Sequence, residues 1–221
     1  LIGLFIGYPH LTALDQGVMT LVQEHRGPTL DEIAVTFTLI GEFRNMLLFS
    51  ALLTGLLLLC RQWRQALFAG GTLLCTALAN TATKNFFARV RPEVRTDPLT
   101  SYSMPSGHAS GAFALFLTLG VLAGRGQPPR MRLTWLLLAC LPALSIALSR
   151  VYLGAHWPTD VLAGAMLAAC VCAASLWLNQ RQTPLNAMPF KVWWLILPAL
   201  LALFSFFALR HLPPAMLRYA Y

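Results

Sequence analysis

Three short polar clusters interrupt an otherwise apolar chain, and each contains residue types that could act on phosphate. They cover residues 84–92, 105–108 and 149–160. Charged and polar side chains next to membrane-spanning stretches are energetically costly, so they usually mark a functional site. The three clusters are therefore the first candidates for a site.

The cationic residues of these clusters could hold a phosphate dianion. Arg91 and Arg150 each offer a planar fork of N–H donors, and Lys84 offers a point charge. Ser106 and Gly107 stand where a helix is expected to begin, and the free N–H groups of a helix N-terminus favour an anion. Gly107 would also let the backbone approach the ligand closely. These five residues predict a phosphate-binding site.

Two histidines supply the remaining parts of a displacement at phosphorus, which needs a nucleophile and an acid for the leaving oxygen. Asp160 follows His156 by four residues. If a helix begins near Pro158, the carboxylate of Asp160 faces back toward His156 and could fix its tautomer. His108 is then left as the general acid. The chemical competitor is a zinc site built from His108, His156 and Asp160, which the three neighbouring cations disfavour.

Each of these residues has an ordinary alternative when taken singly. His108 could cap a helix, Asp160 could be an acid in a first helical turn, and Arg150 could be an interface anchor. Taken together, the coincidence is improbable. Arg89 and Arg95 lie beside the site, and they would either meet a substrate headgroup or be solvated loop residues, the second being at least as favoured.

The elements that must position these residues follow from the composition. The 221-residue chain is 57% hydrophobic and 11% charged, with mean hydropathy +0.63. This composition excludes a disordered chain and disfavours an ordinary soluble domain. The net charge of +8 comes from single basic residues between apolar runs, so nucleic acid is a poor partner and an anionic lipid or substrate a better one.

Apolar stretches predict an all-α fold, a polytopic transmembrane helix bundle of about six spans. A span needs about 20 residues. The expected spans are 44–60, 65–84, 108–124, 133–149 (with a kink at Pro142), 159–178 and 190–209.

Residues 11–43 precede these spans and carry apolar residues at helical spacing on both sides of a break at Gly27-Pro28. They predict two helices that lie on the membrane surface or, alternatively, cap the bundle.

Three regions follow from this pattern. Residues 1–43 hold the interfacial helices and, at 1–8, a truncated first span; residues 44–178 form the catalytic core; residues 179–221 add an extra span and a tail. The layout suggests a domain of a longer polypeptide.

Successive loops should alternate between the two sides of the membrane. One side receives 61–64, 125–132 and 179–191, with seven basic residues and no acid. Outside the candidate site the Lys and Arg count is seven against six, so the count alone leaves the orientation undecided. The acid-free side is taken as cytoplasmic.

The combined pattern Lys-x6-Arg-Pro, Pro-Ser-Gly-His and Ser-Arg-x5-His-x3-Asp resembles the three-part signature of the type-2 phosphatidic acid phosphatase family. These lipid phosphate phosphatases are related to glucose-6-phosphatase and vanadium haloperoxidases. All motif positions match between residues 84 and 160. Order, spacing and placement between spans agree.

The resemblance implies a phosphohistidine on His156, with His108 as proton donor and Asp160 as the partner of His156. It implies phosphate contacts from Lys84, Arg91, Ser106, Gly107, His108 and Arg150. It also implies that no metal or cofactor is required, and that the site faces the periplasm or exterior of a plasma membrane.

We therefore expect an integral membrane phosphatase acting on a lipid phosphomonoester or diphosphate. Candidate substrates are phosphatidic acid, phosphatidylglycerophosphate, undecaprenyl diphosphate and a lipid A phosphate. The alternatives are a lipid phosphotransferase that uses the same phosphohistidine, and a non-catalytic module that binds lipid phosphate.

Overall fold

The protein is described by a computed structural model that covers residues 8–93 and 101–219. Over these residues the chain is helical, with no strand, which confirms the all-α prediction. The helices are α2 (Tyr8–Glu24), α3 (Pro28–Ile40), α4 (Phe43–Leu59), α5 (Trp63–Phe87), α6 (Gly107–Ala123), α7 (Pro129–Tyr152), α8 (Pro158–Gln180) and α9 (Phe190–Tyr219).

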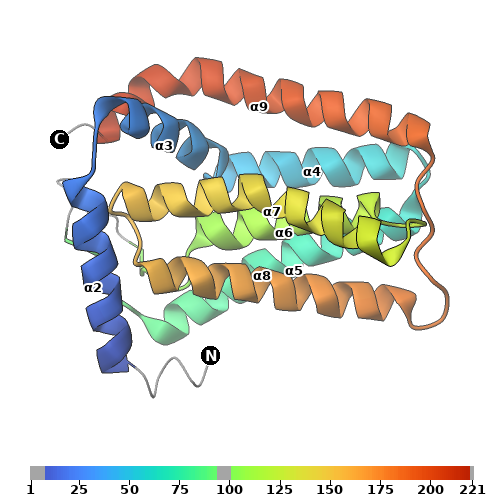
Figure 1. The fold of residues 1–221 in the computed structure, drawn as a ribbon. Coiled ribbons are helices and arrows are strands. Elements are labelled where there is room, and N and C mark those ends of the chain that lie inside the picture. Colours follow the sequence, from blue (N-terminus) through green and yellow to red (C-terminus); the bar gives the residue numbers. More distant parts are fainter. Residues whose placement is uncertain (1–7, 94–100, 220–221) are drawn as a thin grey trace.

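Helices α4 to α9 run alongside one another, while α2 lies across one end of the bundle (Figure 1). Helix α6 is central and contacts α4, α5, α7 and α8. Small residues allow this close packing. A Cβ atom added to Gly120 would lie 2.9 Å from the Cβ of Ala139 on α7, so α6 and α7 meet almost backbone to backbone there.

All six predicted apolar stretches are helical. By length and composition, four helices can cross a membrane: α5, α7, α8 and the Phe190–Arg210 part of α9. Helices α3 and α4 form a pair bent by 53° that would make a fifth span, and α6 is an apolar helix of 17 residues. Helix α7 continues past Pro142 without a break.

The predicted break at Gly27-Pro28 is confirmed, and Pro28 is the first residue of α3. Helix α2 packs against α7 and α8, and α3 packs against α7 and α9. The Gly27 N–H donates to the Tyr152 hydroxyl (3.1 Å), which ties the α2–α3 turn to the end of α7. The arrangement favours the capping alternative for α2. Most of the predicted truncated span, 1–8, lies outside the described residues.

One end of the bundle gathers three loops, as the alternation of loops predicts. Arg64 donates to the carbonyl oxygens of Asn179 (2.6 Å), Thr183 (2.7 Å) and Pro184 (2.9 Å). Arg125 donates to Gln180 (2.7 Å). The loops after α4, α6 and α8 therefore share one end, and the polar clusters lie at the other. Helix α9 packs along α3 and α4. The division of the chain into three regions stays a prediction.

Candidate active site

Backbone hydrogen bonds join the three polar clusters at the end of the bundle that α2 covers. The Ser103 N–H donates to the Arg89 carbonyl (2.8 Å), which links the segment after α5 to the loop before α6. The Ser106 N–H donates to the Asp160 carbonyl (2.9 Å), which links that loop to the first turn of α8. The segment after α5, the loop before α6 and the first turn of α8 are therefore held as one unit.

His156 lies in the turn between α7 and α8 and is almost fully buried, with 2% of its surface exposed. Its N–H and that of Ala155 both donate to the Arg150 carbonyl (3.2 and 2.9 Å). Gly154 has φ +63°, a left-handed conformation that favours glycine and lets the chain reverse there. These hydrogen bonds hold the backbone of His156 against the end of α7.

Arg91 identifies the tautomer of His156. Its Nη1 lies 3.1 Å from Nε2 of the imidazole and also donates to the Ala155 carbonyl (2.6 Å). A guanidinium group only donates, so Nε2 accepts and the ring proton of neutral His156 is assigned to Nδ1. The nitrogen with a lone pair therefore faces the cationic group that is predicted to bind phosphate.

Asp160 faces the other ring nitrogen. Its Oδ2 lies 3.7 Å from His156 Nδ1, longer than a hydrogen bond, and accepts from the Trp157 N–H (2.9 Å). The Ser103 hydroxyl donates to the same oxygen and lies 3.5 Å from Nδ1. Asp160 is thus both an acid in a first helical turn and a carboxylate beside His156, with Ser103 next to both groups.

The three predicted cations are distributed around His156. Lys84 donates to the Tyr102 carbonyl (2.7 Å), and Arg91 donates to the same oxygen (3.4 Å). Arg150 is buried and donates to the Thr38 hydroxyl on α3 (2.5 Å).

Burial lowers the pKa of His156 well below its ordinary value of 6.5, and the charges of Arg150, Arg91 and Lys84 lower it further. His156 is therefore neutral near pH 7, the protonation state that a nucleophilic imidazole requires.

The Pro-Ser-Gly-His turn begins α6 as predicted. Ser106 is the N-cap, and its hydroxyl accepts from the Ala109 N–H (3.4 Å). The Asn80 side chain on α5 donates to the Ser110 hydroxyl (2.9 Å) and to the Pro105 carbonyl (3.4 Å). These bonds hold the first turn of α6, whose leading N–H groups have no acceptor within the helix.

His108 follows in that turn, and its side chain lies against Gly41, where an added Cβ would be 2.8 Å from Cδ2. Its Nε2 is buried and has no hydrogen-bond partner among the described residues. A buried ring nitrogen without a partner is costly and suggests a ligand contact. His108 also lies within electrostatic range of Arg150 and His156.

Arg89 is neither a solvated loop residue nor directed outward. Its side chain is 10% exposed, and its guanidinium group contacts Asp160 Oδ1 (2.7 Å), the Thr159 hydroxyl (2.7 Å) and Asp15 Oδ2 (2.6 Å). The solvated-loop alternative is therefore wrong for Arg89, because two buried carboxylates bind it; contact with a substrate headgroup stays a prediction. Arg95 lies outside the described residues.

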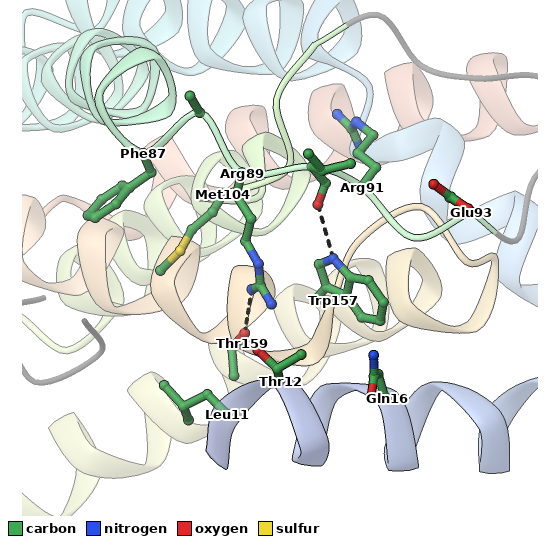
Figure 2. Close-up of a pocket in the computed structure, with 12 residues that line it drawn as sticks. Leu11, Thr12, Gln16, Phe87, Arg89, Arg91, Glu93, Met104, Trp157 and Thr159 are labelled. Carbon is green, nitrogen blue, oxygen red and sulfur yellow. Dashed lines mark hydrogen bonds between the residues drawn. The ribbon is translucent and has the colours of Figure 1, made fainter. Parts of the chain in front are cut away.

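A cavity of about 800 Å³ opens beside the site, between α2 and the segment 87–93. Figure 2 shows Arg89 pointing toward Thr159 at its wall, while the Arg91 side chain points away from Thr12 and Gln16. The Trp157 indole donates to the Val90 carbonyl (3.1 Å). The 87–93 segment therefore lies between the cavity and His156, and it contributes Arg91 to both.

The sequence did not single out four of the residues that hold the site together. They are Asp15, Thr38, Asn80 and Ser103, which all lie at 8% exposure or less. Thr38 and Asp15 come from the N-terminal helices, far in sequence from the motifs. Their buried polar character becomes visible only when α2 and α3 are placed against α7 and α8.

Over residues 8–93 and 101–219, no group of three or more His, Cys, Asp or Glu side chains is placed to hold a metal ion. The zinc alternative therefore has no ligand set in that part of the chain.

Known proteins resemble this chain in sequence. An undecaprenyl-diphosphatase of Sulfolobus acidocaldarius is 38% identical over 95 residues, which is 41% of this chain and 40% of that protein. A decaprenylphosphoryl-5-phosphoribose phosphatase of Mycobacterium tuberculosis is 35% identical over 127 residues, 55% of this chain and 65% of that protein. The chain thus spans 40–65% of the length of these two relatives.

Two solved structures share the fold. The PAP2 type phosphatidylglycerolphosphate phosphatase of Bacillus subtilis superposes with TM-score 0.68 and 23% identity over 82% of this chain and 96% of that chain. Aquifex aeolicus LpxE superposes with TM-score 0.59 and 25% identity over 74% and 94%. The family model of the PAP2 superfamily matches residues 65–184, which include all three polar clusters. The chain belongs to the PAP2 superfamily.

Proposed function

We propose that this protein is a multi-pass membrane phosphatase that removes phosphate from a lipid phosphomonoester or diphosphate. One observation carries the proposal: the Nε2 lone pair of neutral His156 faces the Arg91 guanidinium, 3.1 Å away. A phosphate bound by Arg91 would then lie next to the nucleophilic nitrogen. The relatives that carry phosphatase names support the reaction class.

In the first step, Nε2 of His156 attacks phosphorus. An N–P bond forms and the P–O bond to the lipid breaks. His108, which the bound phosphate dianion favours in its protonated form, gives its proton to the leaving oxygen. Nδ1 keeps its proton and gains a positive charge, which the Asp160 carboxylate stabilises. The buried Nε2 of His108, without a partner among the described residues, supports its role as that donor.

In the second step, water attacks the phosphohistidine. His108, now neutral, takes a proton from the water, the N–P bond breaks and inorganic phosphate leaves. Lys84, Arg91, Arg150 and the first N–H groups of α6, at Ser106 and Gly107, hold the phosphate oxygens in both steps. Each step balances without a metal or an organic cofactor.

The lipid tail would stay in the bilayer while its phosphate reaches the end of the helix bundle. Apolar side chains on the outside of the helices support a bilayer around the protein; they include Leu78 on α5 (62% exposed) and Leu144 on α7 (43% exposed). We assign the site to the periplasmic or outer face of a plasma membrane, opposite the basic loops at 61–64, 125–132 and 179–191.

The test is release of inorganic phosphate by the purified protein in EDTA. The panel holds phosphatidic acid, phosphatidylglycerophosphate, undecaprenyl diphosphate and a lipid A phosphate. Release by wild type that disappears in His156→Ala supports the proposal and ranks the substrates. Phosphate that appears in an acceptor lipid instead would identify the phosphotransferase. Release by the variant at the wild-type rate would overturn the mechanism.

A further inference from the structure

Arg89 lies between two buried carboxylates that belong to different helices. Its Nη1 donates to Asp160 Oδ1 (2.7 Å), and its Nη2 donates to Asp15 Oδ2 (2.6 Å). Both carboxylates are fully buried. Burial disfavours the charge on Arg89, but Asp160 and Asp15 outweigh it and raise the pKa of the guanidinium above its usual value. Arg89 therefore bridges the two carboxylates as a permanent cation.

Asp15 brings α2 into this arrangement. It accepts from the Thr159 N–H (3.0 Å) through Oδ1 and from the Thr159 hydroxyl (2.5 Å) through Oδ2. Thr159 is the neighbour of Asp160 in the first turn of α8. Asp15 thus holds the residue next to Asp160 and, through Arg89, Asp160 itself. Figure 1 shows α2 crossing the end of the bundle where these contacts are made.

These contacts decide which way the Asp160 carboxylate faces. Arg89 holds Oδ1, while the Trp157 N–H and the Ser103 hydroxyl hold Oδ2, the oxygen that faces His156. Rotation of the carboxylate would break the bond to Arg89. The orientation of the group that faces His156 therefore depends in part on Arg89, which Asp15 holds from α2, outside the residues that match the family model.

We propose that Asp15 and Arg89 are positioning residues of the reaction, which orient Asp160 and through it His156, and that α2 is a working part of the active site. This inference rests on the proposed function. Neither residue touches the reacting atoms, so their removal should lower kcat. The KM should change little, because the phosphate contacts of Lys84 and Arg91 remain.

A second ion pair near α2 provides a matched control. Arg26 and Asp31 join the end of α2 to the start of α3 through two bonds of 3.0 Å. In the part of the chain that the structure describes, Asp31 pairs with Arg26 and makes no hydrogen bond to Asp160 or His156. Asp31→Asn therefore removes an ion pair at the turn between α2 and α3 without altering the orientation of Asp160.

The experiment compares Asp15→Asn, Arg89→Gln, Arg89→Lys and Asp31→Asn with wild type, each checked for folding by its thermal midpoint in detergent. We expect Asp15→Asn and Arg89→Gln to lower kcat roughly 10- to 100-fold, as small misplacements in active sites do, with KM within about twofold. Arg89→Lys should recover part of the rate, because an ammonium keeps the charge but bridges two carboxylates poorly. Asp31→Asn should keep the wild-type kcat.

A double mutant separates positioning from general loosening. In an Asp160→Asn background, Asp15→Asn should lower kcat no further, because the group that it positions is gone. Losses that multiply in the double mutant would assign Asp15 a purely structural role and overturn the inference. If Asp15→Asn and Arg89→Gln do not fold, Arg89→Lys carries the same comparison, since it preserves the buried positive charge.

Orthovanadate binding, measured by calorimetry, distinguishes failure of the inference from failure of the proposed function. Asp15→Asn should weaken vanadate binding at least about tenfold, and Asp31→Asn should leave it unchanged. The reason is that the bond between vanadium and the His156 nitrogen needs the same imidazole orientation as the attack on phosphorus. If wild type releases no phosphate from any lipid, but Asp15→Asn binds vanadate more weakly than wild type and Asp31→Asn does not, the proposed function fails and the inference stands. If Asp15→Asn and Arg89→Gln fold and match Asp31→Asn in kcat and in vanadate affinity, the inference is overturned and the proposed function is unaffected.

Discussion

Arg91 and His156 make the contact that organises the site: Nη1 of the arginine lies 3.1 Å from Nε2 of the imidazole. The arginine thereby selects the tautomer that leaves Nε2 unprotonated, and the same cation is placed to hold a phosphate oxygen. Binding the substrate would therefore bring phosphorus next to the nitrogen that we propose attacks it.

The pH dependence of kcat/KM should reflect a histidine with a lowered pKa. Reaction requires neutral His156, so activity is kept at pH 6.5 and falls only as the pH drops through the lowered pKa of the free enzyme. Lys84→Gln removes one of the charges that lower this pKa, so the acid limb should move to higher pH. An acid limb centred above pH 6.5 in wild type would contradict the account.

Ser103→Ala should lower kcat by about 10- to 100-fold, because the hydroxyl lies between the Asp160 carboxylate and Nδ1 of His156. Phosphate-release kinetics measure this effect. The matched control is Ser145→Ala, where the hydroxyl bonds only the Leu141 carbonyl of its own helix in the described contacts. Equal rates for Ser103→Ala and Ser145→Ala would remove Ser103 from the site.

Gly164→Ala should disturb the first turn of α6. An added Cβ would lie 2.7 Å from the Ser106 carbonyl oxygen and 3.1 Å from the Ser110 nitrogen, both backbone atoms that cannot yield easily. We expect a loss of about 1–3 kcal/mol in the free energy of unfolding, together with reduced activity. Thermal unfolding in detergent measures the first quantity.

Gly71→Ala on α5 is the control for that substitution, because nothing lies within 4 Å of its added Cβ. It should be neutral or stabilising by up to about 1 kcal/mol, since alanine favours a helix over glycine. A Gly164→Ala protein as stable as Gly71→Ala would show that α8 and α6 are not packed as closely as described.

The sequence predicts which residues form the candidate site, but not the contacts that hold them. Asp160 follows His156 by only four residues, so the sequence alone could place the two side chains together at the start of one helix. Their placement at one end of the bundle followed from the alternation of loops. Gly27-Pro28 likewise predicted a break, and Pro28 begins α3 because proline favours a first helical turn.

Contacts between distant segments could not be predicted in this way. Asp15, Thr38 and Asn80 stand outside the three polar clusters, and no spacing rule connects them to Arg89, Arg150 or Ser110. Arg89 was interpreted as a solvated or headgroup residue because its two carboxylate partners are 71 and 74 residues away. Only the packing of α2 across the bundle shows that it is buried and paired.

Orthovanadate should inhibit the enzyme, because it adopts the five-coordinate geometry of phosphorus in the transition state. Activity should persist in excess EDTA. Both are measured by phosphate release, and His108→Ala serves as a comparison because it removes the proposed acid but leaves the nucleophile. Loss of activity in EDTA with recovery on adding zinc or magnesium would contradict the mechanism.

The most direct test of the central claim is to trap the phosphoenzyme. A lipid phosphate labelled with ³²P in the transferable group is mixed with the protein, and the reaction is stopped within milliseconds at alkaline pH, where phosphohistidine survives. The account predicts protein-bound label that is lost in acid, is present in wild type and is absent from His156→Ala. Label that remains on His156→Ala, or phosphate release by wild type with no trapped label at any time, would contradict His156 as the nucleophile.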